Sequence, residues 1–197
     1  MPPLEDFWVA IDRAWPATPG APVRIAIIGS TALMLQAAYH RGTKDCDVFE
    51  TTGLGPGARD TLLGLAGPGT PLHRQHALYI DVVGNGVPFL PHQPRWKAVP
   101  ALSGRMSRID VVVLDVVDVV VSKLKRFGPS DQADIDAMIQ DGRVVHADLV
   151  DRFRLAVDVF SHDARADDLP RYVANLHRVE RDMLVVAESE IVLPAWI

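Results

Sequence analysis

Two aspartates with one residue between them, Asp45 and Asp47, are the most chemically capable side chains in this sequence. They open an apolar segment that continues through Val48 and Phe49, and a strand directs residues i and i+2 to the same face. Two adjacent carboxylates repel each other unless a cation lies between them. Because Mg²⁺ prefers oxygen ligands and commonly keeps phosphate oxygens and waters, the pair predicts a metal site. A pair of acids near a turn on a solvent-facing edge is the alternative.

A glycine and a serine, Gly29 and Ser30, follow the apolar segment 23–28 and precede a predicted helix. The backbone N–H groups at a helix N-terminus bind phosphate well. Ser30 could contact a phosphate or simply cap its helix. Arg41 and Lys44 precede the aspartates and could neutralise phosphate, although ordinary charges flanking a turn explain them equally well. Together with the carboxylates, this arrangement predicts a site for a metal-bound nucleoside triphosphate.

The order Gly-Ser, short helix, Asp-x-Asp resembles the DNA polymerase β-like nucleotidyltransferase superfamily. The letters GSTAL and RGTKDCDV are similar to its small bacterial branch, which includes toxin–antitoxin and abortive-infection proteins. Members hold two metal ions on three carboxylates, the third from a later strand, and the resemblance assigns that place to Asp81. It implies Mg²⁺ or Mn²⁺ as the cofactor, and it extends over roughly residues 23 to 140.

Alternation along the chain agrees with Asp81 as the third carboxylate. Within the expected strand 76–83, Leu78, Ile80 and Val82 share an apolar face, which leaves Asp81 on the less buried face. Asp110 shows a similar alternation and is a rival; Asp81 is preferred because of the resemblance and the chain order. An exposed strand position without a function is the alternative reading of Asp81.

A second run, SKLKR at 122–126 followed by Asp131 and Asp134, is also similar to that bacterial branch. Helical spacing puts Lys123 within the apolar arc of the helix expected at 115–127. A lysine there reaches the surface, pairs with an acid such as Asp131, or contacts the triphosphate, and the sequence does not separate these alternatives. Asp131 and Asp134 are expected to support the site.

The composition limits the class of protein. The chain has 197 residues, 48% of them hydrophobic, which suffices for a sizeable core. A net charge of −5 offers no broad basic surface for nucleic acid. The single cysteine excludes an internal disulfide, the first residues lack a secretory signal, and no apolar stretch is long enough to span a membrane. We therefore expect a cytoplasmic protein with no membrane partner.

The predicted elements give an α/β fold of the α+β kind. We expect a small mixed β-sheet nucleotidyltransferase core packed with helices in residues 1–142, followed by a helical C-terminal subdomain packed on it in residues 143–197. Strands are expected at 23–28, 45–49, 76–83 and 108–114. Helices are expected at 3–14 (from the helical spacing of Leu4, Phe7, Trp8 and Ile11), 30–39, 58–66, 115–127, 130–140 (capped by Ser130), 147–161 and 169–188.

These features favour a metal-dependent nucleotidyltransferase that transfers an NMP from an NTP to a hydroxyl of RNA, a protein or a small molecule. The resemblance adds a toxin-type role, with an antitoxin or other partner protein. A catalytically inactive nucleotide-binding or partner-binding protein is the alternative, because a fold does not fix the chemistry. The catalytic and metal-binding residues would be Asp45, Asp47 and Asp81, and the nucleotide-binding residues Gly29, Ser30, Arg41, Lys44 and Lys123.

Overall fold

The computed structural model describes residues 4–17, 20–51, 53–84, 86 and 88–196, and the chain gathers into two compact units. Unit 1 comprises Met1–Val87 and Trp96–Leu114, and unit 2 comprises Pro88–Arg95 and Asp115–Ile197. The domain boundary expected after residue 142 stays a prediction, since compactness alone does not test it. The helices that follow residue 115 lie in unit 2.

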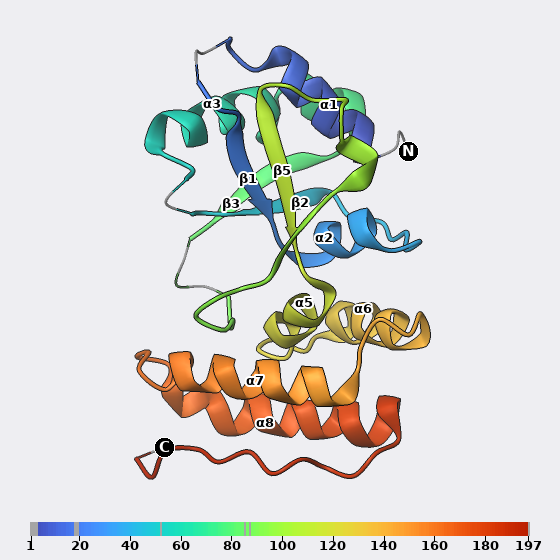
Figure 1. The fold of residues 1–197 in the computed structure, drawn as a ribbon, viewed down its shortest axis with the longest axis vertical. Coiled ribbons are helices and arrows are strands. Elements are labelled where there is room, and N and C mark those ends of the chain that lie inside the picture. Colours follow the sequence, from blue (N-terminus) through green and yellow to red (C-terminus); the bar gives the residue numbers. More distant parts are fainter. Residues whose placement is uncertain (1–3, 18–19, 52, 85, 87, 197) are drawn as a thin grey trace. The chain divides into compact units, whose positions relative to one another are not determined.

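A five-stranded mixed sheet, in the order β3-β2-β1-β5-β4, is central to unit 1 (Figure 1). β1 runs parallel to β5 and antiparallel to β2, β2 runs parallel to β3, and β4 runs antiparallel to β5. This sheet confirms the predicted fold class. The strands are β1 Val23–Ile27, β2 Asp45–Phe49, β3 Tyr79–Val83, β4 Trp96–Ala98 and β5 Ile109–Leu114.

The two faces of β2 differ in burial. Cys46 and Val48 are fully buried, whereas Asp45 is exposed and Asp47 is partly buried. Because side chains alternate along a strand, one face of the sheet packs into the core and the other carries the carboxylates. The sequence pattern therefore fixes which side of the sheet is available for chemistry.

Four α-helices and a 3₁₀ turn complete the described part of unit 1. Helices α1, α3 and α4 contact one another, and α1 buries the apolar residues that gave it helical spacing in the sequence, including Phe7 and Trp8. Helix α2 follows β1 directly. The bounds are α1 Leu4–Ala14, α2 Gly29–Gln36, α3 Pro56–Ala66, α4 Pro71–His76 and η1 Pro100–Leu102.

Unit 2 is helical (Figure 1), and aromatic rings pack together in its core. The ring of Phe89 lies 5.2–5.5 Å, between centroids, from the rings of Phe153, Phe160 and Tyr172. Among the helices within the described ranges, none is both long and apolar enough to cross a membrane. The elements are α5 Val116–Lys123, α6 Pro129–Gln140, α7 His146–Phe160, η2 Ala166–Asp168, α8 Leu169–Arg178 and the π-helical turn η3 Val179–Leu184.

Three details of the predicted elements are wrong. Residues expected to begin a strand at 76 instead end helix α4, which Pro71 begins and the Thr70 hydroxyl caps. Gly128, not Ser130, precedes α6, because Pro129 occupies its first turn. The last helix stops at Leu184 rather than near 188, where Val185 adopts a left-handed conformation with φ of 56°.

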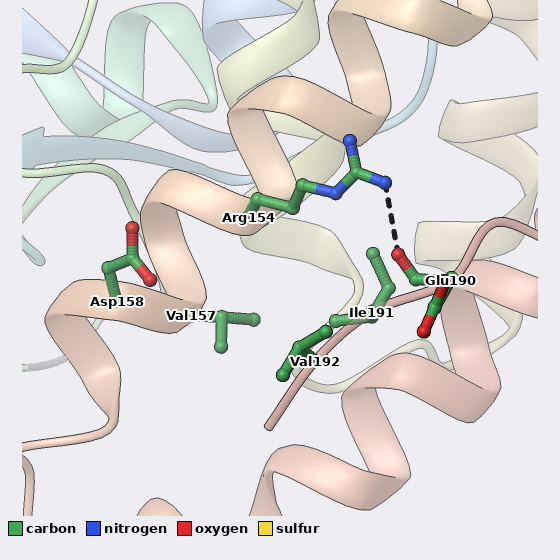
Figure 2. Close-up of a pocket in the computed structure, with 6 residues that line it drawn as sticks. All are labelled: Arg154, Val157, Asp158, Glu190, Ile191 and Val192. Atoms are coloured by element: carbon green, nitrogen blue, oxygen red, sulfur yellow. Dashed lines mark hydrogen bonds between the residues drawn. The ribbon is translucent and has the colours of Figure 1, made fainter. Parts of the chain in front are cut away.

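Beyond Val185 the chain of unit 2 forms no helix or strand within the described residues, and Glu190, Ile191 and Val192 of this tail run beside α7 (Figure 2). Arg154 donates from Nη2 to the carbonyl of Glu190 at 3.0 Å, beside an open pocket of about 420 Å³. The Ser189 N–H donates to the buried carboxylate of Glu180 at 3.1 Å, and the His146 imidazole lies 2.8 Å from the same carboxylate. These polar contacts hold the tail against the helices.

Candidate active site

The strand register aligns the predicted carboxylates. β2 and β3 pair Asp47 with Asp81, and Asp45 with Tyr79, in a parallel ladder. Neighbouring strands lie about 4.8 Å apart, and paired residues face the same way. Asp45, Asp47 and Asp81 therefore project from adjacent points on one face of the sheet.

The rival carboxylate, Asp110, lies elsewhere on that face. It pairs with Arg24 across β1 and β5, and the two side chains form an exposed ion pair at 4.0 Å. Ile28 is level with Asp47, since its N–H donates to the Asp47 carbonyl. Asp110 is thus four residues, or about 13 Å, further along the strand direction. At that distance Asp110 and Asp47 cannot bind the same metal ion, which favours Asp81 as the third carboxylate.

Gly29 brings the start of helix α2 against the Asp47 carboxylate. Its φ is +68°, and a Cβ placed there would lie 2.7 Å from Asp47 Oδ2. Only glycine fits, both for its left-handed backbone and for the space. Ile28, the N-cap residue of α2, makes no side-chain capping hydrogen bond. The N-terminus of α2 at Gly29 and the Asp47 carboxylate thus lie next to each other, in what we call the phosphate corner.

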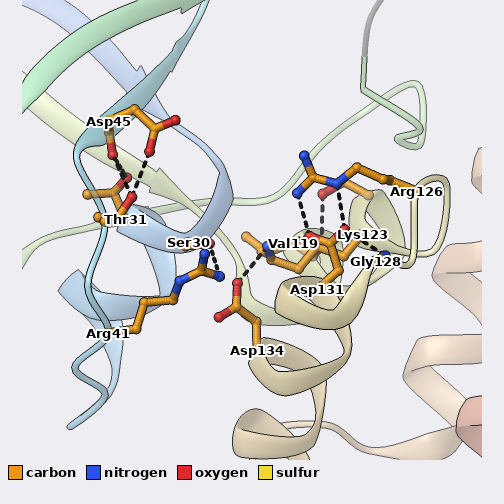
Figure 3. Close-up of polar contacts among 12 residues, drawn as sticks. Ser30, Thr31, Arg41, Asp45, Val119, Lys123, Arg126, Gly128, Asp131 and Asp134 are labelled. Carbon is orange, nitrogen blue, oxygen red and sulfur yellow. Dashed lines mark hydrogen bonds and ion pairs between the residues drawn. The ribbon is translucent and has the colours of Figure 1, made fainter.

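Ser30 and Arg41 lie at the same helix start. Arg41 donates from Nη1 to Ser30 Oγ at 3.2 Å (Figure 3). Because Ser30 is the second residue of α2, it is not the cap that the sequence left as an alternative. A guanidinium beside a helix N-terminus attracts anions, so this corner suits a phosphate. Lys44 is exposed just before β2.

The three carboxylates lie on one face of the sheet, but their side chains do not converge into a metal-binding cluster within the described ranges. Asp45 Oδ1 accepts a hydrogen bond of 2.6 Å from the Thr43 hydroxyl, so it is turned toward its own loop. Across the described ranges, no three or more His, Cys, Asp or Glu side chains are disposed to hold a metal ion. The oxygen-only donor set and the backbone spacing fit a hard divalent cation, but Asp45 would have to rotate away from Thr43 to ligate.

Cys46 has no place in this site. It points to the buried face, where it is fully inaccessible to solvent. Burial raises the pKa of its thiol far above the ordinary value, so it remains a neutral packing residue. The alternation of side chains along β2 directs Cys46 away from Asp45 and Asp47.

Lys123 lies in unit 2 within a buried ion network (Figure 3). Its ammonium is 3.2 Å from Asp131 Oδ1 and 2.7 Å from Asp134 Oδ2, and its side chain is only 7% exposed. Arg126 adds two hydrogen bonds to Asp131, at 2.7 and 2.8 Å. The run SKLKR with its two following aspartates therefore joins α5 to α6.

The charge balance of this network has a direct consequence for Asp131. Burial by itself raises the pKa of that carboxyl, but the hydrogen bond from Arg126 and the charge of Lys123 outweigh burial and lower it below its ordinary value. The ion pair is the second of the three alternatives that the sequence left open for Lys123. Its contact with a triphosphate stays a prediction.

Sequence reasoning missed several polar residues around these elements. Asp118, in the first turn of α5, is fully buried and accepts hydrogen bonds of 2.6 and 2.7 Å from Arg152. Thr43 and Tyr79 adjoin the carboxylates, and neither was predicted to be a site residue. Tyr79 could have been found, since it precedes Asp81 by two residues on the same face, whereas Thr43 has no pattern to mark it.

Comparison with known proteins places these features in a family. A family model described as "Nucleotidyltransferase of unknown function (DUF6036)" matches residues 18–169. No curated protein and no solved structure matches the chain significantly. The matched region contains the start of α2, the carboxylates Asp45, Asp47 and Asp81, and the ion network around Lys123. It spans well over half of the sequence. The chain therefore belongs to this nucleotidyltransferase family.

Proposed function

We propose that the chain is a metal-dependent nucleotidyltransferase that transfers an NMP from an NTP to an acceptor hydroxyl. One observation carries this proposal: Asp47 and Asp81 are paired across β2 and β3, and Asp47 lies against Gly29 at the start of α2. Membership of the family supports the general class. The metal, the nucleotide and the acceptor are part of the proposal.

The phosphates would bind at the N-terminus of α2, where Ser30 and Arg41 meet. Asp45, Asp47 and Asp81 would hold Mg²⁺ or Mn²⁺, which when bound neutralises triphosphate charge and stabilises the entering and leaving oxygens. The chain's own contribution is to position the nucleotide and neutralise charge, which is how most of the catalysis in such transfers arises.

In the reaction itself, the acceptor oxygen attacks the α-phosphorus, and the bond from that phosphorus to the bridging oxygen of the β-phosphate breaks. Pyrophosphate leaves with the electron pair of that bond. The carboxylate of Asp81, on the exposed edge strand, receives the proton of the acceptor hydroxyl. The acceptor belongs to RNA, to a protein or to a small molecule.

The test is a transfer assay with α-labelled NTPs and Mg²⁺ against RNA and protein acceptors. Asp47→Asn should reduce labelling at least about 100-fold, in the range usual for an acid–base or charge-stabilising group. Asp110→Asn is the matched control, because it removes the same charge from the same sheet face about 13 Å away. Equal labelling by wild type and Asp47→Asn would refute the proposal.

One observation favours the alternative, a nucleotide-binding protein without transfer: Asp45 is engaged by Thr43 rather than turned toward Asp47. Tight NTP binding with no labelling from any of the four NTPs would select that alternative. The toxin-type role, a cytoplasmic location and an antitoxin partner also remain proposals. Co-purification of the product of a neighbouring gene would support the partner.

A further inference from the structure

Tyr79 is an aromatic residue on the face that carries the proposed metal ligands. It pairs with Asp45 across β2 and β3 and precedes Asp81 by two residues. β3 is an edge strand of the sheet. Tyr79 is partly buried and Asp81 exposed, so this end of the face is open to a ligand.

Helix α4 braces the Tyr79 ring. The imidazole of His73 stands edge-on to it, with centroids 5.2 Å apart and planes at 73°. His73 is itself fixed, because its Nδ1 accepts from the N–H of Gly69 at 2.9 Å and its own N–H donates to the Thr70 hydroxyl at 3.2 Å. An aromatic ring held in this way is a preorganised surface.

Tyr79 and the phosphate corner lie on opposite sides of the carboxylates. Gly29 and Ser30 follow β1, which borders β2 on one side, while β3 borders β2 on the other. If the phosphates bind beside Gly29 and the α-phosphorus lies at the carboxylates, the nucleoside extends away from β1. It then passes over β3, where Tyr79 is the aromatic side chain on that face.

We propose that Tyr79 is the platform on which the nucleobase of the bound NTP stacks, an inference that rests on the proposed function. Every nucleobase has a π face, so stacking on a single aromatic ring tolerates all four bases. His73 acts through Tyr79 as a positioning residue. The site therefore takes purine and pyrimidine NTPs with similar affinity unless other side chains discriminate between them.

The test compares two ligands on each variant by titration calorimetry with Mg²⁺: a nonhydrolysable NTP and inorganic triphosphate. Tyr79→Leu should weaken NTP binding roughly 5- to 150-fold, as expected for loss of one stacked base, and leave triphosphate binding unchanged. Tyr79→Phe and Tyr79→Trp keep a π face and should bind the NTP about as well as wild type. They also guard against a folding defect specific to Tyr79→Leu.

Trp96→Leu is the control for simple loss of an aromatic ring. Trp96 lies on β4, the opposite edge strand, where it packs on Phe49 with ring centroids 6.0 Å apart. NTP binding by this variant should match wild type. A Trp96→Leu loss as large as that of Tyr79→Leu would overturn the assignment.

Four further results would also overturn it, and the first three separate it from the proposed function. If Tyr79→Leu weakens both ligands equally, or if Tyr79→Phe binds as poorly as Tyr79→Leu, the ring is no base platform. If Tyr79→Leu binds the NTP normally, the platform is refuted while the proposed function stands. If wild type binds neither ligand, both proposals fail.

Discussion

At the scale of single residues, the left-handed backbone and missing side chain of Gly29 let the start of α2 approach Asp47. Gly29→Ala should abolish transfer, because its Cβ would displace the Asp47 carboxylate 2.7 Å away. It should also lower the free energy of unfolding by about 1–2 kcal/mol, the cost of a left-handed conformation for a residue with a side chain. Urea denaturation and the transfer assay measure the two effects.

Gly142→Ala provides the matched control for this prediction. Gly142 has almost the same φ, +67°, but a Cβ there meets nothing within 4 Å. It should show the backbone cost without any change in transfer. If Gly29→Ala retains wild-type transfer, the close approach of Gly29 to Asp47 has no functional importance.

His76 is a buried histidine that the structure leaves without hydrogen bonds from other described residues. It is 6% exposed, neither ring nitrogen has a partner there, and its ring packs on Phe7 at 5.5 Å. His76→Leu should therefore raise the free energy of unfolding by about 1 kcal/mol, since it removes unpaired polar atoms. Thermal denaturation checks this, with the exposed His92→Leu as a control that should change little.

At the scale of elements, the link between α5 and α6 depends on a buried charge. Lys123→Met leaves the carboxylates of Asp131 and Asp134 with less compensation and should cost about 3–5 kcal/mol in unfolding free energy. Lys125→Met, which removes a more exposed lysine packed on Phe160, should cost less than about 1 kcal/mol. Chemical denaturation of both variants gives the comparison.

Unchanged stability together with weaker phosphate binding would give Lys123 a different role. If Lys123→Met unfolds like wild type but binds inorganic triphosphate more weakly, its main partner is phosphate rather than the two aspartates. That result would support the triphosphate contact predicted from the sequence and contradict the structural role described above.

Alternation and apolar runs predicted four of the five strands of the sheet, because each pattern is local, but they did not predict the short strand β4, which lies in a proline-rich stretch without clear periodicity. The short helix α4 escaped prediction because six residues give too little periodicity, and its signals were the cap at Thr70 and the proline that follows. The tail after Leu184 carries apolar spacing compatible with a helix. The structure instead forms no helix there and packs Glu190, Ile191 and Val192 against α7, a tertiary contact that the sequence pattern does not reveal.

The candidate site was predictable only in part for the same reason. The spacing of Asp45 and Asp47 fixes their common face within one strand. Their alignment with Asp81, and the remoteness of Asp110, depend on the sheet order and register, which join segments far apart in the chain. Likewise, the sequence could not choose among the partners of Lys123, because the choice is made by packing between helices.

At the scale of the whole molecule, buried carboxylates make stability depend on pH. Burial alone raises the pKa of Glu180, but hydrogen bonds from His146 and Ser189 outweigh it and lower that pKa below its ordinary value of 4.5. The pKa of Asp131 is likewise lowered from 3.8. A lowered folded-state pKa gives stability that is complete above the unfolded value and is lost as the pH falls through the folded value.

Unfolding free energy should therefore hold steady from neutral pH down to about 5 and fall below the ordinary values of 4.5 and 3.8. Denaturation curves between pH 3 and 7 measure this. Glu180→Gln should be less stable at neutral pH and show a shallower acid dependence, whereas the exposed Glu190→Gln should follow wild type. An acid limb of unchanged slope in Glu180→Gln would contradict this origin of the pH dependence.

The most direct test of the central claim is a crystal grown with Mn²⁺ and a nonhydrolysable NTP, with anomalous data collected at the manganese edge. The account predicts a manganese peak about 2.1 Å from carboxylate oxygens of both Asp47 and Asp81, with Asp45 rotated away from Thr43. A bound nucleotide with manganese at other residues, or with Asp47 and Asp81 still unligated, would contradict it.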